Sequence, residues 1–333
     1  MAGWAGRWYA ERGRSVLEIA CDESGYEGEK LIGTTTDVFA HASVRLDTEA
    51  STSCLAELRD RIRSPAQEYK ANHLLRQKHR SVLTWLLGPS APLAGNAHVY
   101  LVDKAYLVLA RIIDLLVAEQ PAEPMARTLY REGRRGFDPG QWEAFLASAN
   151  RLLRANDRID APTPVDSFFG TVDGLRRAGA GGRADQILGL FQRARPRATA
   201  FRARPVDHPR TAPTLDPLVP AIIRAVAGWG GGGEPVAIVH DRQNTLSADR
   251  IAQLTETLGT RLAGLRFVGS RSDPRVQVAD ILAGVARKIA SDELNGQGDP
   301  QLTALLRPYL DPLSIWGDDR SWSRLVPGSG SQP

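Results

Sequence analysis

Short apolar runs rich in β-branched residues occur near both ends of the chain and predict strands. These runs lie at residues 16–22, 31–36, 38–44, 97–102, 235–241 and 264–268. Between them, apolar residues recur at helical spacing and predict helices over residues 53–63, 80–87, 105–119, 218–229, 251–262 and 276–292. The order is three strands, with the second and third as antiparallel hairpin partners, followed by strands that alternate with helices. It predicts an α/β fold whose mixed sheet is flanked by helices.

The pattern changes over residues 121–233, where helical segments are interrupted by Gly and Pro. We interpret this segment as a mainly helical insertion. It divides one discontinuous domain into residues 15–120 and 234–325. Residues 326–333 are rich in Gly, Ser and Pro and predict a disordered tail.

Acidic residues follow three of the strand runs: Asp22, Asp103 and Asp241. Ligands of open α/β sheets gather at the carboxyl ends of strands. A fourth acid, Asp280, lies in the apolar stripe of a late helix, where a carboxylate is costly to bury unless a cation accompanies it. We therefore expect Asp22, Asp241 and Asp280 to approach within metal-bridging reach, with Asp103 or Glu68 as a fourth ligand.

Structural roles compete with this interpretation. The segment Asp22-Glu23-Ser24-Gly25 has the composition of a simple turn. Asp103 precedes a helix and suits an N-cap. Capping explains Asp241 less well, because Ser247 is the better cap for the helix that follows.

Converging carboxylates favour Mg²⁺ or Mn²⁺, and two such ions support phosphodiester cleavage. Other chemistries lack their motifs: the chain has no P-loop, no HExxH zinc site and no GxSxG elbow. Its two cysteines, Cys21 and Cys54, are too few for a disulfide framework. No apolar run is long enough to span a membrane and no signal peptide is evident, so we expect a cytoplasmic protein without a membrane partner.

Positive charge is concentrated in one part of the chain. Residues 125–212 hold 16 Arg, no Lys and nine acids, an excess of seven charges in a chain whose net charge is +4. The candidate phosphate-binding residues are Arg193, Arg195, Arg197, Arg202 and Arg204. A solvated helix face in an arginine-biased sequence accounts for the charge run equally well.

Several motifs, in order, resemble the bacterial domain-of-unknown-function family 3800 (DUF 3800). They are Asp22-Glu23-Ser24-Gly25, Glu68-Tyr69-Lys70, Val102-Asp103-Lys104, Leu215-Asp216-Pro217-Leu218, His240-Asp241, and the segment from Ser270 to Gly284 that carries Asp280. The resemblance implies a ribonuclease-H-like fold with three antiparallel strands and then parallel strands, and a nuclease-like metal site. It implies Asp22, Glu23, Lys70, Asp241 and Asp280 as site residues, and a mobile-element or defence context.

Two functions follow as hypotheses. The first is a metal-dependent nuclease or phosphodiesterase acting on DNA or RNA, in which Lys70 neutralises phosphate or orients the attacking water. The second is a non-catalytic module that binds nucleic acid or protein through the arginine-rich insertion. Three converging acids favour the enzyme, because a binding module has no need of them.

Overall fold

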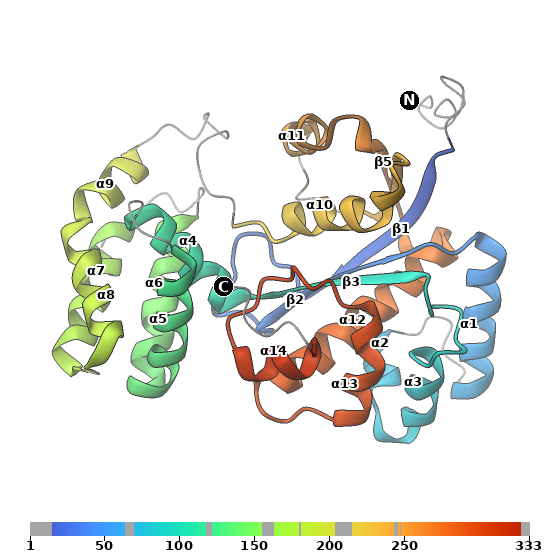
Figure 1. The fold of residues 1–333 in the computed structure, drawn as a ribbon, viewed down its shortest axis with the longest axis horizontal. Helices are drawn as coiled ribbons and strands as arrows, with labels where there is room; N and C mark the ends of the chain where they lie inside the picture. The colour runs from blue at the N-terminus through green and yellow to red at the C-terminus, as the bar shows by residue number, and fades with distance from the viewer. Residues whose placement is uncertain are drawn as a thin grey trace.

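A five-stranded mixed sheet forms the centre of the molecule (Figure 1). The structure is a computed structural model that describes residues 15–63, 70–117, 122–154, 163–179, 181–203, 215–242, 246 and 248–327. The strands are β1 Leu17–Ser24, β2 Val38–Val44, β3 Ala97–Asp103, β4 Val236–Asp241 and β5 Leu262–Val268. In the sheet order β3-β2-β1-β4-β5, β2 is antiparallel to both neighbours, and β1, β4 and β5 are parallel. The predicted mixed α/β sheet flanked by helices is confirmed.

Helices cover both faces of this sheet (Figure 1). Their bounds are α1 Thr48–Ile62, α2 Ala71–Leu74, α3 Arg80–Leu86, α4 Lys104–Leu116, α5 Ala122–Gly136, α6 Pro139–Leu153, α7 Pro164–Ala178, α8 Gly182–Arg193, α9 Arg195–Ala203, α10 Leu218–Trp229, α11 Ala248–Leu258, α12 Pro274–Leu294, α13 Pro300–Leu306 and α14 Asp319–Leu325. Helix α12 packs across β1 and β2 on one side, which we call the α12 face. Helix α10 packs on β3 and β2 on the other side, the α10 face. Helices α5 to α9 form a helical lobe at the left of Figure 1.

Local sequence explains why α12 lies so close to the sheet. Asp273 caps the helix by accepting a hydrogen bond from the backbone N–H of Arg275 at 3.0 Å, and Pro274 occupies the first turn. Ala279, Ala283 and other small residues then face the strands and are fully buried. Because these side chains are short, the helix approaches the sheet closely.

The strand predicted at residues 31–36 is wrong. This segment is an irregular loop between β1 and β2. Its backbone is held by a side chain instead of a neighbouring strand: Asn150 Oδ1 accepts hydrogen bonds from the N–H groups of Leu31 and Ile32 at 3.0 and 3.2 Å. Gly33 has a φ of +68°, which breaks an extended run.

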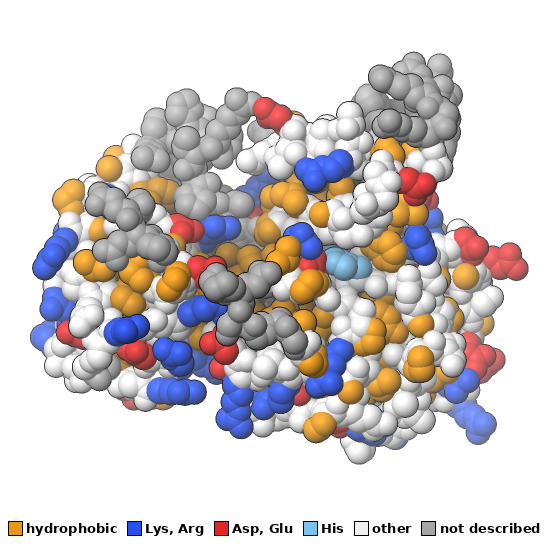
Figure 2. Space-filling model, viewed as in Figure 1, with side chains coloured by type: hydrophobic (Ala, Val, Ile, Leu, Met, Phe, Trp, Pro, Cys, Tyr) orange, Lys and Arg blue, Asp and Glu red, His pale blue; other side chains and the backbone are white. Residues whose placement is uncertain are grey.

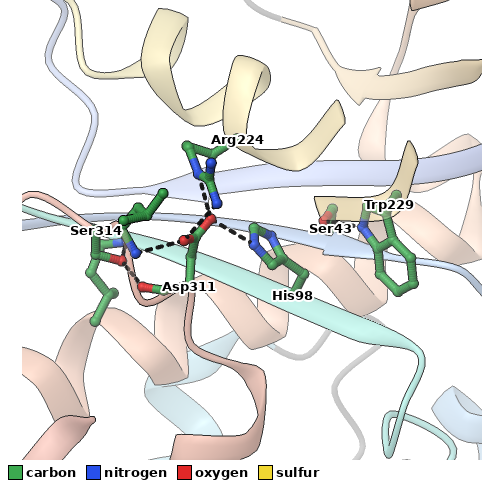
Figure 3. Close-up of polar contacts among 8 residues, drawn as sticks. Ser43, His98, Arg224, Trp229, Asp311 and Ser314 are labelled. Atoms are coloured by element: carbon green, nitrogen blue, oxygen red, sulfur yellow. Dashed lines mark hydrogen bonds and ion pairs between the residues drawn. The ribbon is translucent and has the colours of Figure 1, made fainter. Parts of the chain in front are cut away.

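The lobe shares its core with the sheet. Phe145, Phe168 and Phe191 of the lobe belong to the same buried cluster as Ile19 and Phe39 of the strands. Residues 121–233 also contain α10, which covers the sheet and does not belong to the lobe. The last residue of α10, Trp229, donates from Nε1 to Ser43 Oγ of β2 at 2.8 Å (Figure 3).

The C-terminal segment returns to the edge of the sheet at β3. The carboxylate of Asp311 is fully buried and accepts hydrogen bonds from Arg224 Nε of α10 at 2.8 Å and from the His98 ring of β3 at 3.0 Å (Figure 3). One side chain thus ties three distant segments together. Among the described residues, no helix is long and apolar enough to cross a membrane.

Candidate functional site

The sheet places Asp22 and Asp241 on the same face at the same edge. Cys21 pairs with His240 in the parallel register of β1 and β4, so the next residue on each strand is Asp22 or Asp241. Side chains alternate along a strand, and Ala20 and Val239, two positions earlier, both belong to the core under α12. The two aspartates therefore lie side by side on the α12 face, where the strands end.

Helix α12 brings Asp280 to this edge. Asp280 and Gly284 lie one turn apart on the same side of the helix. A Cβ atom on Gly284 would lie 2.4 Å from the Ala71 Cβ and 3.9 Å from Ser24 Oγ, so this side of α12 lies against the end of β1. The packing requires glycine at position 284.

The electrostatics of Asp22 show that the acids act on one another. Asp22 is only 5% exposed, and burial raises the pKa of its carboxyl to about 9, helped by the negative charges of Glu23, Asp280 and Asp241. A hydrogen bond from the Glu23 N–H to Asp22 Oδ1, 2.7 Å long, opposes the shift. Four acidic residues from three segments far apart in sequence thus share one electrostatic environment.

Two arginines of α12 tie this helix to β1. Arg275 pairs with Glu18 of β1 and with Asp273 at the helix start, and Arg287 donates to Ser24 Oγ at 2.9 Å. These contacts hold α12 against the end of β1.

Lys70 reaches the site from α2. It occupies the N-cap position of that helix and precedes Ala71, which contacts α12 at Gly284. Its own side chain is exposed. Lys70 is thus adjacent in sequence to a residue that contacts α12 one turn from Asp280. Glu68, the alternative fourth ligand, and Tyr69 of the same motif lie outside the described residues.

Glu23 lies on the α10 face, opposite Asp22. Its cross-strand partner is His41, and its carboxylate lies 3.7 Å from Nε2 of His240. The two imidazoles are fully buried, with their Nε2 atoms 3.3 Å apart. The Asp241 carbonyl accepts from His240 Nδ1, so His240 Nε2 accepts the proton of His41.

This histidine pair was missed at the sequence level. Burial lowers the pKa of His240 to about 4 and that of His41 well below its usual value, so both rings are neutral at neutral pH. The available signal was the alternation of β2, which places His41 on the face of Phe39.

Asp103 does not join the acidic group. It is 1% exposed and caps α4, accepting a hydrogen bond from the Tyr106 N–H at 3.1 Å. Burial raises its pKa to about 6 against hydrogen bonds from Tyr130 and Tyr106, and it is not among the charges that act on Asp22. Its alternative role as a helix cap is the one that the structure shows.

The donor chemistry of the acidic group suits Mg²⁺ or Mn²⁺, because hard divalent cations prefer carboxylate oxygens. In the part of the chain that the structure describes, no group of three or more His, Cys, Asp or Glu side chains is close enough to hold a metal ion. The acids therefore share an electrostatic environment without forming a ligand cage.

The predicted arginine stripe lies on the lobe, where the described side chains have structural partners. Arg195 pairs with Asp166 and lies over the Phe169 ring at 5.0 Å. Arg197 donates to the Leu116 carbonyl that ends α4, at 3.0 Å. Arg202 donates to the carbonyl of Arg154 after α6. Arg193 is exposed, and Arg204 lies outside the described residues.

The surface of the lobe also carries charges of both signs (Figure 2). On the face shown in Figure 2, basic and acidic side chains are interspersed over the lobe.

Comparison of the chain with known protein families, with curated proteins and with solved structures found no match. The resemblance to family 3800 therefore stays an interpretation of the motifs.

Proposed function

We propose that the chain is a metal-dependent phosphodiester hydrolase acting on nucleic acid, with Asp22, Asp241 and Asp280 as the residues that hold Mg²⁺ or Mn²⁺. What supports this proposal is that Asp22 and Asp241 lie side by side on the α12 face and that the charges of Asp241 and Asp280 both act on Asp22. When bound, a divalent cation supplies positive charge that offsets the charge of the phosphodiester under attack.

The residues of the chain contribute in different ways. Asp22 is buried and its carboxyl retains a proton, so cation binding has to displace that proton. Lys70 presents an exposed amine at the start of α2 and neutralises a phosphate oxygen. Glu23 adds negative charge from the opposite face, where its carboxylate lies 3.7 Å from His240 Nε2.

Further features support the proposal. Three antiparallel strands followed by two parallel strands accord with a ribonuclease-H-like sheet. The cysteines are both buried free thiols, which accords with a reducing cytoplasmic setting. The arginines of the lobe support nucleic-acid binding less well, because several hold backbone carbonyls.

The test combines turnover and binding. Wild-type protein is incubated with labelled single- and double-stranded DNA and RNA in Mg²⁺, Mn²⁺ or chelator, and cation binding is measured by calorimetry. We expect Asp22→Asn and Asp280→Asn to lose cleavage and cation binding. The exposed Asp60→Asn on α1 is the matched control and keeps both. Full activity of Asp22→Asn would overturn the assignment.

A further inference from the structure

A cleft of about 400 Å³ lies beside the end of β1, the strand that carries Asp22. It is lined by the loop between β1 and β2, the start of α4 and the far half of α12. The side chains that carry its chemistry are Thr34, Thr36, Lys104, Arg287 and Ser291. Hydroxyls and cations thus line one hollow.

Lys104 is a buried cation without a carboxylate partner. It is 1% exposed, and its ammonium donates to Thr36 Oγ1 at 2.8 Å and to Thr34 Oγ1 at 3.1 Å. In the described part of the chain no carboxylate forms an ion pair with it. Two neutral hydroxyls do not offset the cost of burying a charge.

Arg287 places a second cation in the same cleft. Its Nε donates to Ser24 Oγ, and among the described residues it too forms no ion pair. Burial lowers the pKa of Lys104 to about 8; the charge of Glu27, and less that of Asp37, oppose this shift, whereas the charge of Arg287 adds to it. Two cations that repel each other in a hollow form a site for an anion.

The acids near the cleft offset part of this charge, because Asp37 acts on both Lys104 and Arg287, and Glu27 acts on Lys104. Asp37 accepts hydrogen bonds from Ser291 Oγ at 2.6 Å and Asn295 Nδ2 at 2.5 Å, on the last turns of α12. Glu143 of α6 is exposed. Both carboxylates are therefore engaged with other groups or with solvent.

Gly25 connects the cleft to the segment that carries Asp22. Its φ is +79°, and a Cβ there would lie 2.8 Å from Arg287 Cδ and 3.0 Å from Thr36 Oγ1. Thus Ser24 and Gly25 position the cleft, while Asp22 of the same motif belongs to the acidic group. Arg287 also lies two turns beyond Asp280 on α12, about 10 Å along the helix axis.

We propose that this cleft is a phosphate subsite, in which Lys104, Arg287 and the hydroxyls of Thr34 and Thr36 hold a backbone phosphate of a nucleic-acid strand next to the acidic site. The inference rests on the proposed function for the identity of the strand. The anion itself is recognised by two cations and by hydroxyl donors that a phosphate's oxygens can accept.

The first test needs no catalysis and uses inorganic phosphate in chelated buffer at constant ionic strength. We expect the thermal midpoint of the wild type to rise with phosphate, as for any ligand of the folded state. Lys104→Met is expected to have a higher midpoint without phosphate, because an unpaired buried charge is removed, and to show no rise with phosphate. Lys78→Met, an exposed lysine outside the cleft, is the control and keeps the wild-type response.

The second test uses a fluorescent single-stranded DNA oligonucleotide, again with chelator. Lys104→Met and Arg287→Gln are each expected to reduce the slope of log affinity against log salt by about 0.7. Arg287→Gln serves if the lysine variant fails to fold. Asp22→Asn is expected to leave the slope unchanged, which separates the two proposals. If the wild type cleaves no nucleic acid but responds to phosphate as expected, only the proposed function is overturned. If both cleft variants keep the wild-type phosphate binding and salt slope, the subsite is overturned.

Discussion

Asp22 carries electrostatic strain, because it is buried among other negative charges. Its folded-state pKa of about 9 is far above the ordinary value of 3.8. Below about pH 4 the carboxyl is neutral in both states and costs nothing. As pH rises from about 4 to 9, the unfolded chain ionises and the folded chain does not, so stability falls across this window.

Asp22→Asn is therefore expected to stabilise the cation-free protein, and the gain grows as pH rises from about 5 to 8. Thermal unfolding of wild type and variant in chelator across this range measures the effect. Addition of Mn²⁺ is expected to raise the wild-type midpoint and leave the variant's unchanged. A variant that is less stable than wild type at every pH contradicts the assignment of strain to Asp22.

A second residue, Asp311, shows the opposite arrangement, in which a buried acid is well compensated. Burial acts to raise its pKa, but hydrogen bonds from His98 and Arg224 outweigh it and lower the pKa to about 2. Its contribution to stability is therefore present above about pH 4 and is lost as pH falls towards 2.

Asp311→Asn is expected to cost about 3 kcal/mol near neutral pH, because Arg224 loses its buried counter-ion. Urea unfolding measures this loss, which is expected to shrink below about pH 4. Asp114→Asn, which breaks an exposed pair with Arg111, is the control and is expected to cost less than about 1 kcal/mol. Equal losses of unfolding free energy in the two variants would contradict the conclusion that the Asp311 cluster stabilises the fold more than an exposed ion pair does.

At the scale of the element, helix ends explain what the arginines of the lobe do. The last carbonyls of a helix lack partners within the helix. Arg197 supplies a donor to the end of α4, and Arg202 supplies one to the segment after α6. Arginines whose charge suggests a nucleic-acid surface in the sequence thus donate hydrogen bonds to backbone carbonyls at helix ends in the fold.

Arg197→Ala is accordingly expected to lower stability by about 1–2 kcal/mol, as for the loss of a hydrogen bond from a charged donor. Chemical denaturation measures this loss, with the exposed Arg193→Ala as the matched control. The structural interpretation is wrong if Arg197→Ala is as stable as the control and instead weakens the salt dependence of oligonucleotide binding.

The sequence predicted those parts of the fold and the site that depend on local pattern. The positions of Asp22 and Asp241 after predicted strands were enough to indicate that they lie at the same end of the sheet. Local pattern failed at residues 31–36, where the extended, threonine-rich run is held by Asn150 from a helix over a hundred residues away. The cleft around Lys104 was unpredictable for the same reason, because its walls come from three distant segments.

At the scale of the whole molecule, the shared core makes the lobe and the sheet one cooperative unit. Buried residues of α4 to α9 and of β1, β2 and β3 form one continuous cluster. The lobe therefore has no complete core of its own. Helices α5 to α9, although they are inserted in the sequence, therefore do not form an independent domain.

We expect one unfolding transition in calorimetry, with calorimetric and van't Hoff enthalpies that agree. Removal of residues 122–203 is expected to expose the buried side of α4 and prevent folding. Two separate transitions, or a truncated protein with a native near-ultraviolet spectrum, would falsify the single-core description.

The sheet order also sets when the site is completed during synthesis. Strand β1 occupies the centre, yet its parallel neighbour β4 begins at Val236, and Asp280 follows later still. At about 5–20 residues per second, roughly 13 to 50 seconds separate the translation of Asp22 from that of Asp280. During this interval a ribosome-bound chain can fold its antiparallel strands without assembling the acidic group. The metal-dependent activity proposed above would thus be absent until Asp280 has been translated.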